Sequence, residues 1–146
     1  MPLLLGCAMP VLEWIRQRFE PASLGERGEQ QAARHLRRLG YKVLFLRHRQ
    51  RYGEVDIIAV DDKTVVFVEV KTRRREDRGR AAEAVDSKRQ QRLTRAGLAF
   101  LKSHGLLEYA SRFDVVEVIW PEQEKRPAIR HLKDAFPAVG KGQMYS

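Results

Sequence analysis

The order of sequence patterns predicts a mixed α/β domain with one helix, three strands, a second helix and one or two further strands. Residues 51–75 contain two apolar runs of strand type joined by turn-type residues, and a capped, amphipathic helix pattern lies on each side of this region. The 146 residues, of which 43% are hydrophobic, are enough for a single domain with its own core. A central sheet of four or five strands flanked by helices is therefore expected.

The first helix is predicted to open at Ser23, because Ser23 and Glu26 have the spacing of a capping box, and to close at Gly40. Glu29 falls on the inward-facing stripe of this helix. A carboxylate on a packing face is unusual, so Glu29 is either a first-turn acid favoured by the helix dipole or a functional group. The apolar members of the stripe are Ala32, Ala33, Leu36 and Leu39.

Three strands are expected next. Residues 41–46 form the first, and a basic run at 47–52 is expected to be a loop. Residues 54–60 and 64–71 are rich in Val, Ile, Thr and Phe, and the turn-type residues 61–63 join them as a hairpin.

Charged residues interrupt this apolar hairpin. Side chains alternate faces along a strand, so Glu54 and Asp56 should share one face, and Glu69 and Lys71 should share one face. Acids on buried strands are costly unless they are paired. A Mg²⁺ ion is a natural partner for such oxygens. A lysine on the same side would steady a water or a developing negative charge.

The second helix is predicted to start within 86–90, where Ser87 and Gln90 have capping-box spacing, and to stop at Gly105. The polar segment 73–80 before it is expected to be a loop beside the site. Residues 112–120 read as the fourth strand, in which Asp114 is expected to be structural. Residues 128–132 are expected to form a short edge strand, and residues 133–136 a closing turn with Phe136 tucked in.

The net charge of +9 indicates a polyanionic partner, with nucleic acid ahead of an anionic membrane. Two basic runs are candidates for phosphate contacts, although a plain solvated loop is the alternative reading of each. A single cysteine excludes an internal disulfide and a cysteine-rich zinc site. The candidates in the two runs are Arg47, Arg49 and Arg51, then Arg73, Arg74 and Arg75.

The two ends of the chain are predicted to lie outside the domain. Residues 1–22 are expected to be an arm, with Met1 or Met9 as the true start, residues 23–136 the domain and residues 137–146 a frayed tail. The N-terminal apolar stretch is interrupted by prolines and is too short for a secretory signal or a membrane span. A cytoplasmic protein without membrane insertion is therefore expected.

The central motif resembles a known nuclease signature. Glu69 follows Asp56 by thirteen positions and opens a Glu-x-Lys element, a pattern similar to the PD-(D/E)XK signature in its Gly-Glu-x-Asp variant. Over residues 23–136 the chain resembles the YraN-like family of small bacterial proteins, which is related by this core to archaeal Holliday-junction resolvases. The chain departs from this pattern at Arg47, where relatives tend to carry Asn.

This resemblance implies a restriction-endonuclease-like core and a metal-dependent nuclease. The implied Mg²⁺ or Mn²⁺ ligands are Glu29, Asp56 and Glu69 with the carbonyl of Val70, and Lys71 is the implied catalytic lysine. Glu54, Gln90 and Lys88 are secondary candidates.

The implied substrate is nucleic acid, with DNA favoured and branched DNA included. A nucleic-acid-binding module that cuts only inside a complex, or not at all, is the alternative, and an adaptor for an acidic partner is a third reading. Resolvase-type enzymes act as dimers, so a homodimer is an implied partner as well.

Overall fold

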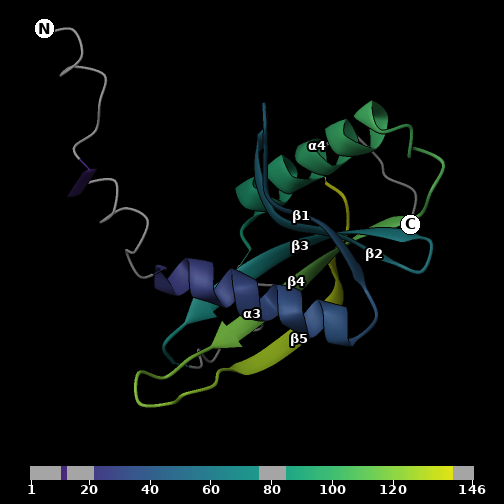
Figure 1. The fold of residues 1–146 in the computed structure, drawn as a ribbon. Helices are drawn as coiled ribbons and strands as arrows, with labels where there is room; N and C mark the ends of the chain where they lie inside the picture. The colour runs from purple at the N-terminus through teal and green to yellow at the C-terminus, as the bar shows by residue number, and fades with distance from the viewer. Residues whose placement is uncertain (1–10, 13–21, 76–84, 140–146) are drawn as a thin grey trace, which may run out of the picture.

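The structure is a computed structural model that describes residues 11–12, 22–75 and 85–139. The predicted arm lies almost entirely outside the described residues, as do the greater part of the predicted 73–80 loop and residues 140–146 of the predicted tail. The described part forms a five-stranded mixed sheet with two helices, α3 and α4, in the predicted order (Figure 1). The predicted α/β class is confirmed.

Helix α3 (Leu24–Arg38) begins and ends as its sequence predicts. Ser23 and Glu26 form both hydrogen bonds of the capping box, each 3.2 Å long. Gly40 follows the helix with a φ of +93°, a backbone conformation that glycine adopts without strain.

Helix α4 (Ser87–Ser103) is capped one residue earlier than predicted. Asp86 is the N-cap, because its carboxylate accepts the backbone N–H of Arg89 at 2.8 Å, and Ser87 is the first helical residue. At the other end, Gly105 follows the helix with a φ of +67°, so the predicted stop there is confirmed.

The strands β1 (Lys42–Gln50), β2 (Gly53–Asp61), β3 (Thr64–Arg73), β4 (Ser111–Ile119) and β5 (Ala128–Phe136) lie in that order across the sheet. All neighbouring pairs are antiparallel except β3 and β4, which are parallel and are linked through α4. The predicted turn at Asp62 is confirmed, since this residue has a left-handed φ of +54° between β2 and β3.

Two predicted loops are strand instead. β1 continues to Gln50, because His48 packs against Phe100 and the side chain of Gln50 donates to the carbonyl of Ala96 in α4. β5 is a full strand rather than a short strand and a closing turn. Asp134 has a φ of +51° and donates its N–H to the carboxylate of Asp114, so the strand bends there and continues.

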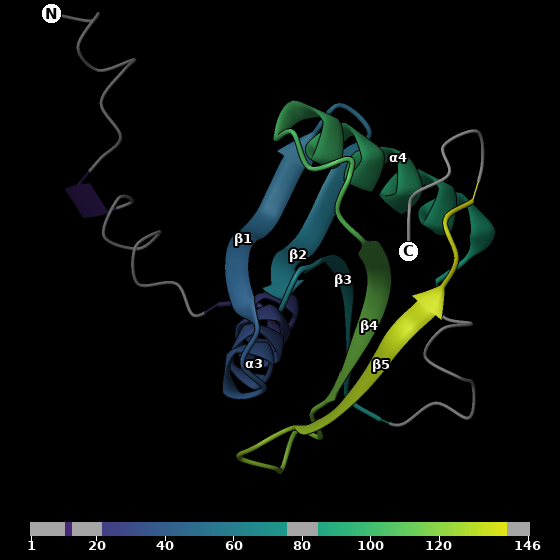
Figure 2. The same cartoon turned by 90° about the vertical axis from the view of Figure 1, so that its right-hand side faces the viewer.

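The sheet has a core on each face, and the two helices lie on opposite faces (Figure 2). On the α4 side, Phe67 and Phe113 pack against Phe100, Leu93 and neighbouring residues. Phe136 stacks on Phe113 with ring centroids 5.0 Å apart, so its predicted burial is confirmed. On the α3 side, Ala32, Ala33, Leu36, Ile57, Val66, Val68 and Trp120 form the second core. Neither described helix is long and apolar enough to cross a membrane.

Candidate functional site

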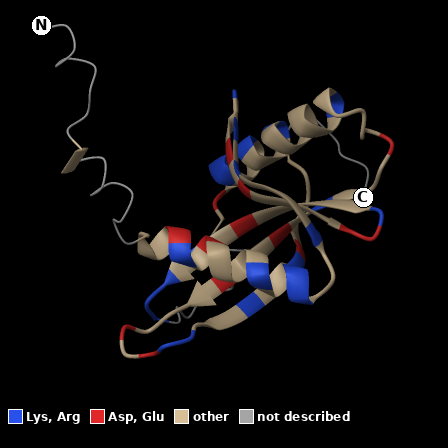
Figure 3. Ribbon diagram, in the orientation of Figure 1, with Lys and Arg blue, Asp and Glu red and all other residues tan. Residues whose placement is uncertain are grey.

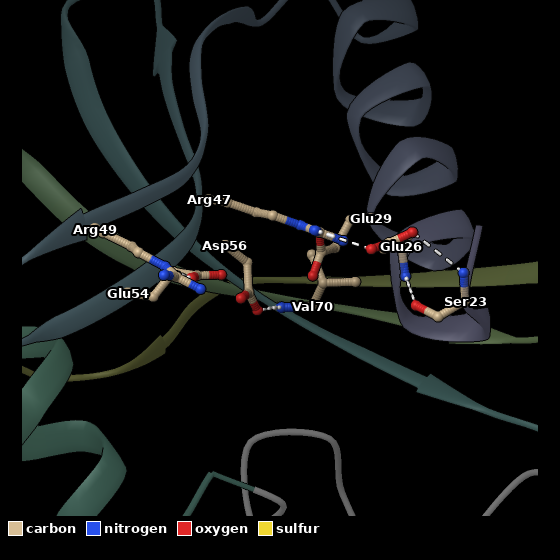
Figure 4. Close-up of polar contacts among 8 residues, drawn as sticks. All are labelled: Ser23, Glu26, Glu29, Arg47, Arg49, Glu54, Asp56 and Val70. Carbon is tan, nitrogen blue, oxygen red and sulfur yellow. Dashed lines mark hydrogen bonds and ion pairs between the residues drawn. The ribbon is translucent and has the colours of Figure 1, made fainter. Parts of the chain in front are cut away.

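Asp56 lies where β2 and β3 stop pairing. The register between these strands runs from Asp61 opposite Thr64 to Ile57 opposite Val68 and ends there. Beyond that point, Asp56 Oδ2 accepts the backbone N–H of Val70 at 2.8 Å (Figure 4). A side-chain carboxylate therefore takes the place of a main-chain carbonyl, and it is held between two strands as they separate.

The strict alternation predicted for β2 is wrong at this point. Val55 and Ile58 are three residues apart, yet both belong to the core on the α4 side, so the alternation breaks between them. Glu54, expected beside Asp56, forms an ion pair with Arg49 of β1 at 2.9 Å (Figure 4). The Glu54 side chain thus pairs within the β1–β2 hairpin, while its backbone carbonyl accepts a hydrogen bond from Arg89 of α4 at 2.9 Å.

Glu69 and Lys71 share a face of β3, as their spacing predicts. Lys71 Nζ lies 3.5 Å from Glu69 Oε1. The Glu69 side chain is only 6% exposed, and the guanidinium of Arg89 contacts both of its oxygens, with Nη2 to Oε2 at 2.9 Å and Nε to Oε1 at 3.4 Å. A buried carboxylate is tolerated here because two cations neutralise it.

Arg89 was missed at the sequence level, although its neighbours Lys88 and Gln90 were candidates. Lys88 is exposed, and the side chain of Gln90 donates to the carbonyl of Val85 at 2.8 Å. Arg89 alone of these three is seen to reach the acidic residues. The sequence signal for Arg89 was the cluster of basic residues at the start of α4. Which of these side chains points inward depends on how α4 packs on the sheet.

Glu29 is brought close to the strands by a tight helix contact. A Cβ placed on the neighbouring Gly28 would lie 1.9 Å from Thr72 Oγ1, so the backbone of α3 rests directly on β3. Arg47 of β1 then donates its Nε–H to Glu29 Oε2 at 2.6 Å and Nη1 to Glu26 at 3.2 Å (Figure 4). Arg47 has a left-handed φ of +52°, a conformation that Asn tolerates better than most residues.

The carboxylates act on one another electrostatically. Burial raises the pKa of Asp56 to about 7, and the negative charges of Glu69 and, more weakly, Glu29 add to this effect against the hydrogen bond from Val70. Burial alone would lower the pKa of Arg89, but its hydrogen bond to Glu69 and the charges of Glu69, Asp56 and Glu54 raise it. The site is therefore a cluster of carboxylates whose negative charges act on the guanidinium of Arg89.

The donor chemistry suits Mg²⁺ or Mn²⁺, since all three side chains offer carboxylate oxygens. As the side chains stand, however, no group of three or more His, Cys, Asp or Glu residues within the described ranges is arranged to hold a metal ion. Arg47 holds Glu29, and Arg89 holds Glu69. The ligands are thus of the right kind, and two of the three are engaged by arginines.

Five of the six predicted phosphate-binding arginines are exposed, and Arg73 is half-buried. The Arg49 side chain is 86% exposed although it pairs with Glu54. Arg74 donates to the carbonyl of Trp120 at 3.3 Å, and Arg73 lies 4.0 Å from the carboxylate of Glu117. Figure 3 shows basic residues toward the C-terminal end of α3 and at the N-terminal end of α4, with acidic residues at the start of α3 and on the central strands.

Glu117 of β4 is a buried acid for which the sequence predicted no role. It lies opposite Lys71 in the parallel register of β3 and β4, and it is 1% exposed. Arg130 of β5 approaches it at 3.4 Å. Its place beside Lys71 follows from the strand register.

One hollow beside the carboxylates lies between α3 and β1. It has a volume of about 310 Å³ and is lined by Glu26, Glu29, Gln30, Leu46 and Arg47. A hollow of about 440 Å³ beside α4 is lined by Tyr52, Thr94, Arg95, Leu98, Ala99, Lys102 and Val139, none of which belongs to the acidic cluster. Of these two hollows among the described residues, the one on the α3 side has a member of the cluster, Glu29, in its lining.

Comparison with known proteins supports the family membership expected from the sequence. The model of the uncharacterised protein family UPF0102 matches residues 28–118, which include Glu29, Asp56, Glu69 and Lys71. The chain belongs to the UPF0102 family. This assignment confirms the YraN-like membership predicted from the sequence.

Relatives from several bacteria match most of the chain. A UPF0102 protein of Rhodopirellula baltica is 44% identical over 147 residues, covering 95% of this chain and 88% of the relative. One from Alkaliphilus metalliredigens is 41% identical over 114 residues, covering 78% and 97%. One from Geobacter sulfurreducens is 44% identical over 113 residues, covering 77% and 88%.

Proposed function

We propose that this UPF0102 protein is a nuclease with a restriction-endonuclease-like core of the PD-(D/E)XK kind. It hydrolyses phosphodiester bonds of nucleic acid with Mg²⁺ or Mn²⁺, and DNA, including branched DNA, is its favoured substrate class. The observation that carries the proposal is the convergence of Asp56, Glu69 and Lys71 where β2 and β3 separate. The proposal takes the protein to be cytoplasmic, where its substrate is. The homodimer stays a prediction.

Each side chain has a role that its position supports. Asp56, Glu69 and Glu29, with the carbonyl of Val70, would hold the cation. A bound Mg²⁺ or Mn²⁺ supplies Lewis-acid chemistry, acidifying water and neutralising charge on a phosphate. Lys71 keeps its ammonium group beside Glu69, from where it would donate a hydrogen bond to a water and offset negative charge on the phosphate.

The exposed arginines supply the nucleic-acid surface of this proposal. Arg47, Arg49, Arg51, Arg74 and Arg75 are exposed, and such groups contact phosphates without reading sequence. The half-buried Arg73 is proposed for the same surface. The contacts of Arg47, Arg49, Arg73 and Arg74 with Glu29, Glu54, Glu117 and Trp120 give these residues a part in holding the site together as well.

One observation favours the alternative of a binding module without intrinsic cleavage. Two of the three proposed ligands are engaged by arginines, and the described residues contain no ready-made metal group. A module of this kind would bind nucleic acid with a steep salt dependence and leave it uncut.

A cleavage assay separates the two functions. Labelled duplex, single-stranded, flap and four-way-junction DNA, and RNA, would be incubated with Mg²⁺, Mn²⁺ or EDTA. We expect metal-dependent cutting of one class, and a loss of at least about a hundredfold in Asp56→Ala, Glu69→Ala and Lys71→Ala. Lys63→Ala is the matched control, since it removes an exposed lysine from the turn of the same hairpin.

Equal cutting by the wild type and all three variants would overturn the proposed site. Binding that falls with salt, without any cutting, would favour the module. Indifference to nucleic acid would favour the adaptor.

A further inference from the structure

Arg89 contacts three parts of the site, namely the start of α4, strand β3 and strand β2. Its backbone is fixed by the N-cap of α4, where Asp86 accepts its N–H. Its side chain reaches Glu69 of β3 with two contacts, and its Nη2 also donates to the carbonyl of Glu54 in β2 at 2.9 Å. Bidentate arginine–carboxylate pairs are among the strongest ion pairs in proteins.

The guanidinium of Arg89 lies among negatively charged carboxylates. The carboxylates of Glu69, Asp56 and Glu54 all act on it electrostatically. Cations contact both oxygens of Glu69, because Arg89 lies 2.9 Å from Oε2 and 3.4 Å from Oε1, and Lys71 Nζ lies 3.5 Å from Oε1. A Mg²⁺ ion needs such an oxygen at about 2.0–2.1 Å, so it competes with the guanidinium for the same lone pairs.

We propose that Arg89 is a built-in counter-ion that competes with the divalent cation for Glu69. In the metal-free chain Arg89 neutralises this buried carboxylate and holds α4 to the strands. When a cation binds, Arg89 gives up Glu69, so the affinity of the site for metal is set partly by the strength of this pair. Arg89 is thus a positioning residue. The inference rests on the cation site of the proposed function and does not depend on cleavage.

The test is Mn²⁺ binding measured by calorimetry on the full-length chain without nucleic acid. We expect Arg89→Gln to bind Mn²⁺ about tenfold more tightly than the wild type, because the competing charge is gone. Arg92→Gln is the matched control. It removes one exposed positive charge from the same helix and should change the affinity less than about twofold.

A stability readout accompanies the titration. In EDTA, Arg89→Gln should melt below the wild type, because Glu69 is left buried without its strongest partner. With saturating Mn²⁺ this difference should shrink or reverse. A purely structural arginine would give the same deficit with and without metal, and that result would overturn the proposal.

A measurement on the wild type covers the case in which Arg89→Gln does not fold. The side-chain Nε–H resonance of Arg89 should shift during titration with Mg²⁺, as its hydrogen bond to Glu69 is lost. Mg²⁺ binding without such a shift, weaker Mn²⁺ binding by a folded Arg89→Gln, or no metal binding at all would each overturn the inference. Metal binding with the expected competition but no cleavage of any nucleic acid would sustain it while overturning the proposed nuclease.

Discussion

Asp56 and Asp114 lie on either side of β3, and the pKa of the first carboxyl is raised while that of the second is lowered. Val68 of β3 pairs with Ile57, the neighbour of Asp56, on one side and with Asp114 on the other. Burial alone would raise the pKa of Asp114, but hydrogen bonds from His131, Arg112 and the backbone of Asp134 outweigh it and lower the pKa. Burial and neighbouring acids raise the pKa of Asp56 to about 7.

The difference separates a residue that stabilises the fold from one that the fold merely tolerates. Asp114 is completely buried and receives hydrogen bonds of 2.8–2.9 Å from His131, Arg112 and Asp134. Among the contacts of the described residues, Asp56 receives a hydrogen bond from the backbone N–H of Val70, and the carboxylates of Glu69 and Glu29 act on it electrostatically. Acids held in such an unfavourable setting are typical of functional sites, because a positive ligand relieves the strain.

The largest effect is expected from Asp114→Ala. The variant would leave His131 without its hydrogen-bond partner and Arg112 with Asp61, at 3.0 Å, as its remaining acidic partner among the described contacts. We expect a loss of about 3–5 kcal/mol in the free energy of unfolding, measured by urea titration. Glu108→Ala, at an exposed turn position, should change it by less than about 0.5 kcal/mol. Equal values for the two variants would break the distinction drawn between Asp114 and Asp56.

The next largest effect concerns Glu29, whose negative charge acts on Asp56. Gly28→Ala would force α3 away from Thr72 and carry Glu29 with it, so we expect a loss of about 2–3 kcal/mol. It should also lower the pKa of Asp56, measured by carboxyl ¹³C NMR, because one neighbouring negative charge recedes. Gly25→Ala is the control on the same helix, where the nearest atom to the new Cβ, Ser23 Oγ, is 3.9 Å away. If Gly28→Ala proved as stable as Gly25→Ala, the close contact of α3 with β3 would be wrong.

The features that could be predicted from the sequence are local ones. The capping box at Ser23, the glycine after each helix and the shared face of Glu69 and Lys71 depend on spacing along one segment. The break in alternation at Asp56 and the inward turn of Arg89 depend on contacts between segments far apart in the chain. The extension of β1 has the same cause, since α4 supplies the partners of His48 and Gln50. Residue types thus indicated the chemistry of the site, and tertiary packing decided which residues meet.

The smallest expected effect concerns the pH dependence of stability, because the pKa of Asp56 is raised and that of Asp114 is lowered. A native pKa of about 7 means that folded Asp56 holds its proton more tightly than the unfolded chain, whose carboxyl has the ordinary value of 3.8. Stability is therefore lost as pH rises from about 4 to about 7, and the loss is complete above that range. Asp56→Asn cannot ionise, so in EDTA it should be more stable than the wild type by about 1–2 kcal/mol at pH 8 and equal to it near pH 3.5.

Urea titrations at the two pH values would measure this difference, with Asp62→Asn in the exposed turn of the same hairpin as the control. A destabilised Asp56→Asn at pH 8 would put Asp56 in the same class as Asp114. The expected gain in stability, joined to the loss of metal binding and cleavage, would instead identify Asp56 as a residue retained for function at the expense of the metal-free fold, because a substitution that only repaired packing would not remove both activities.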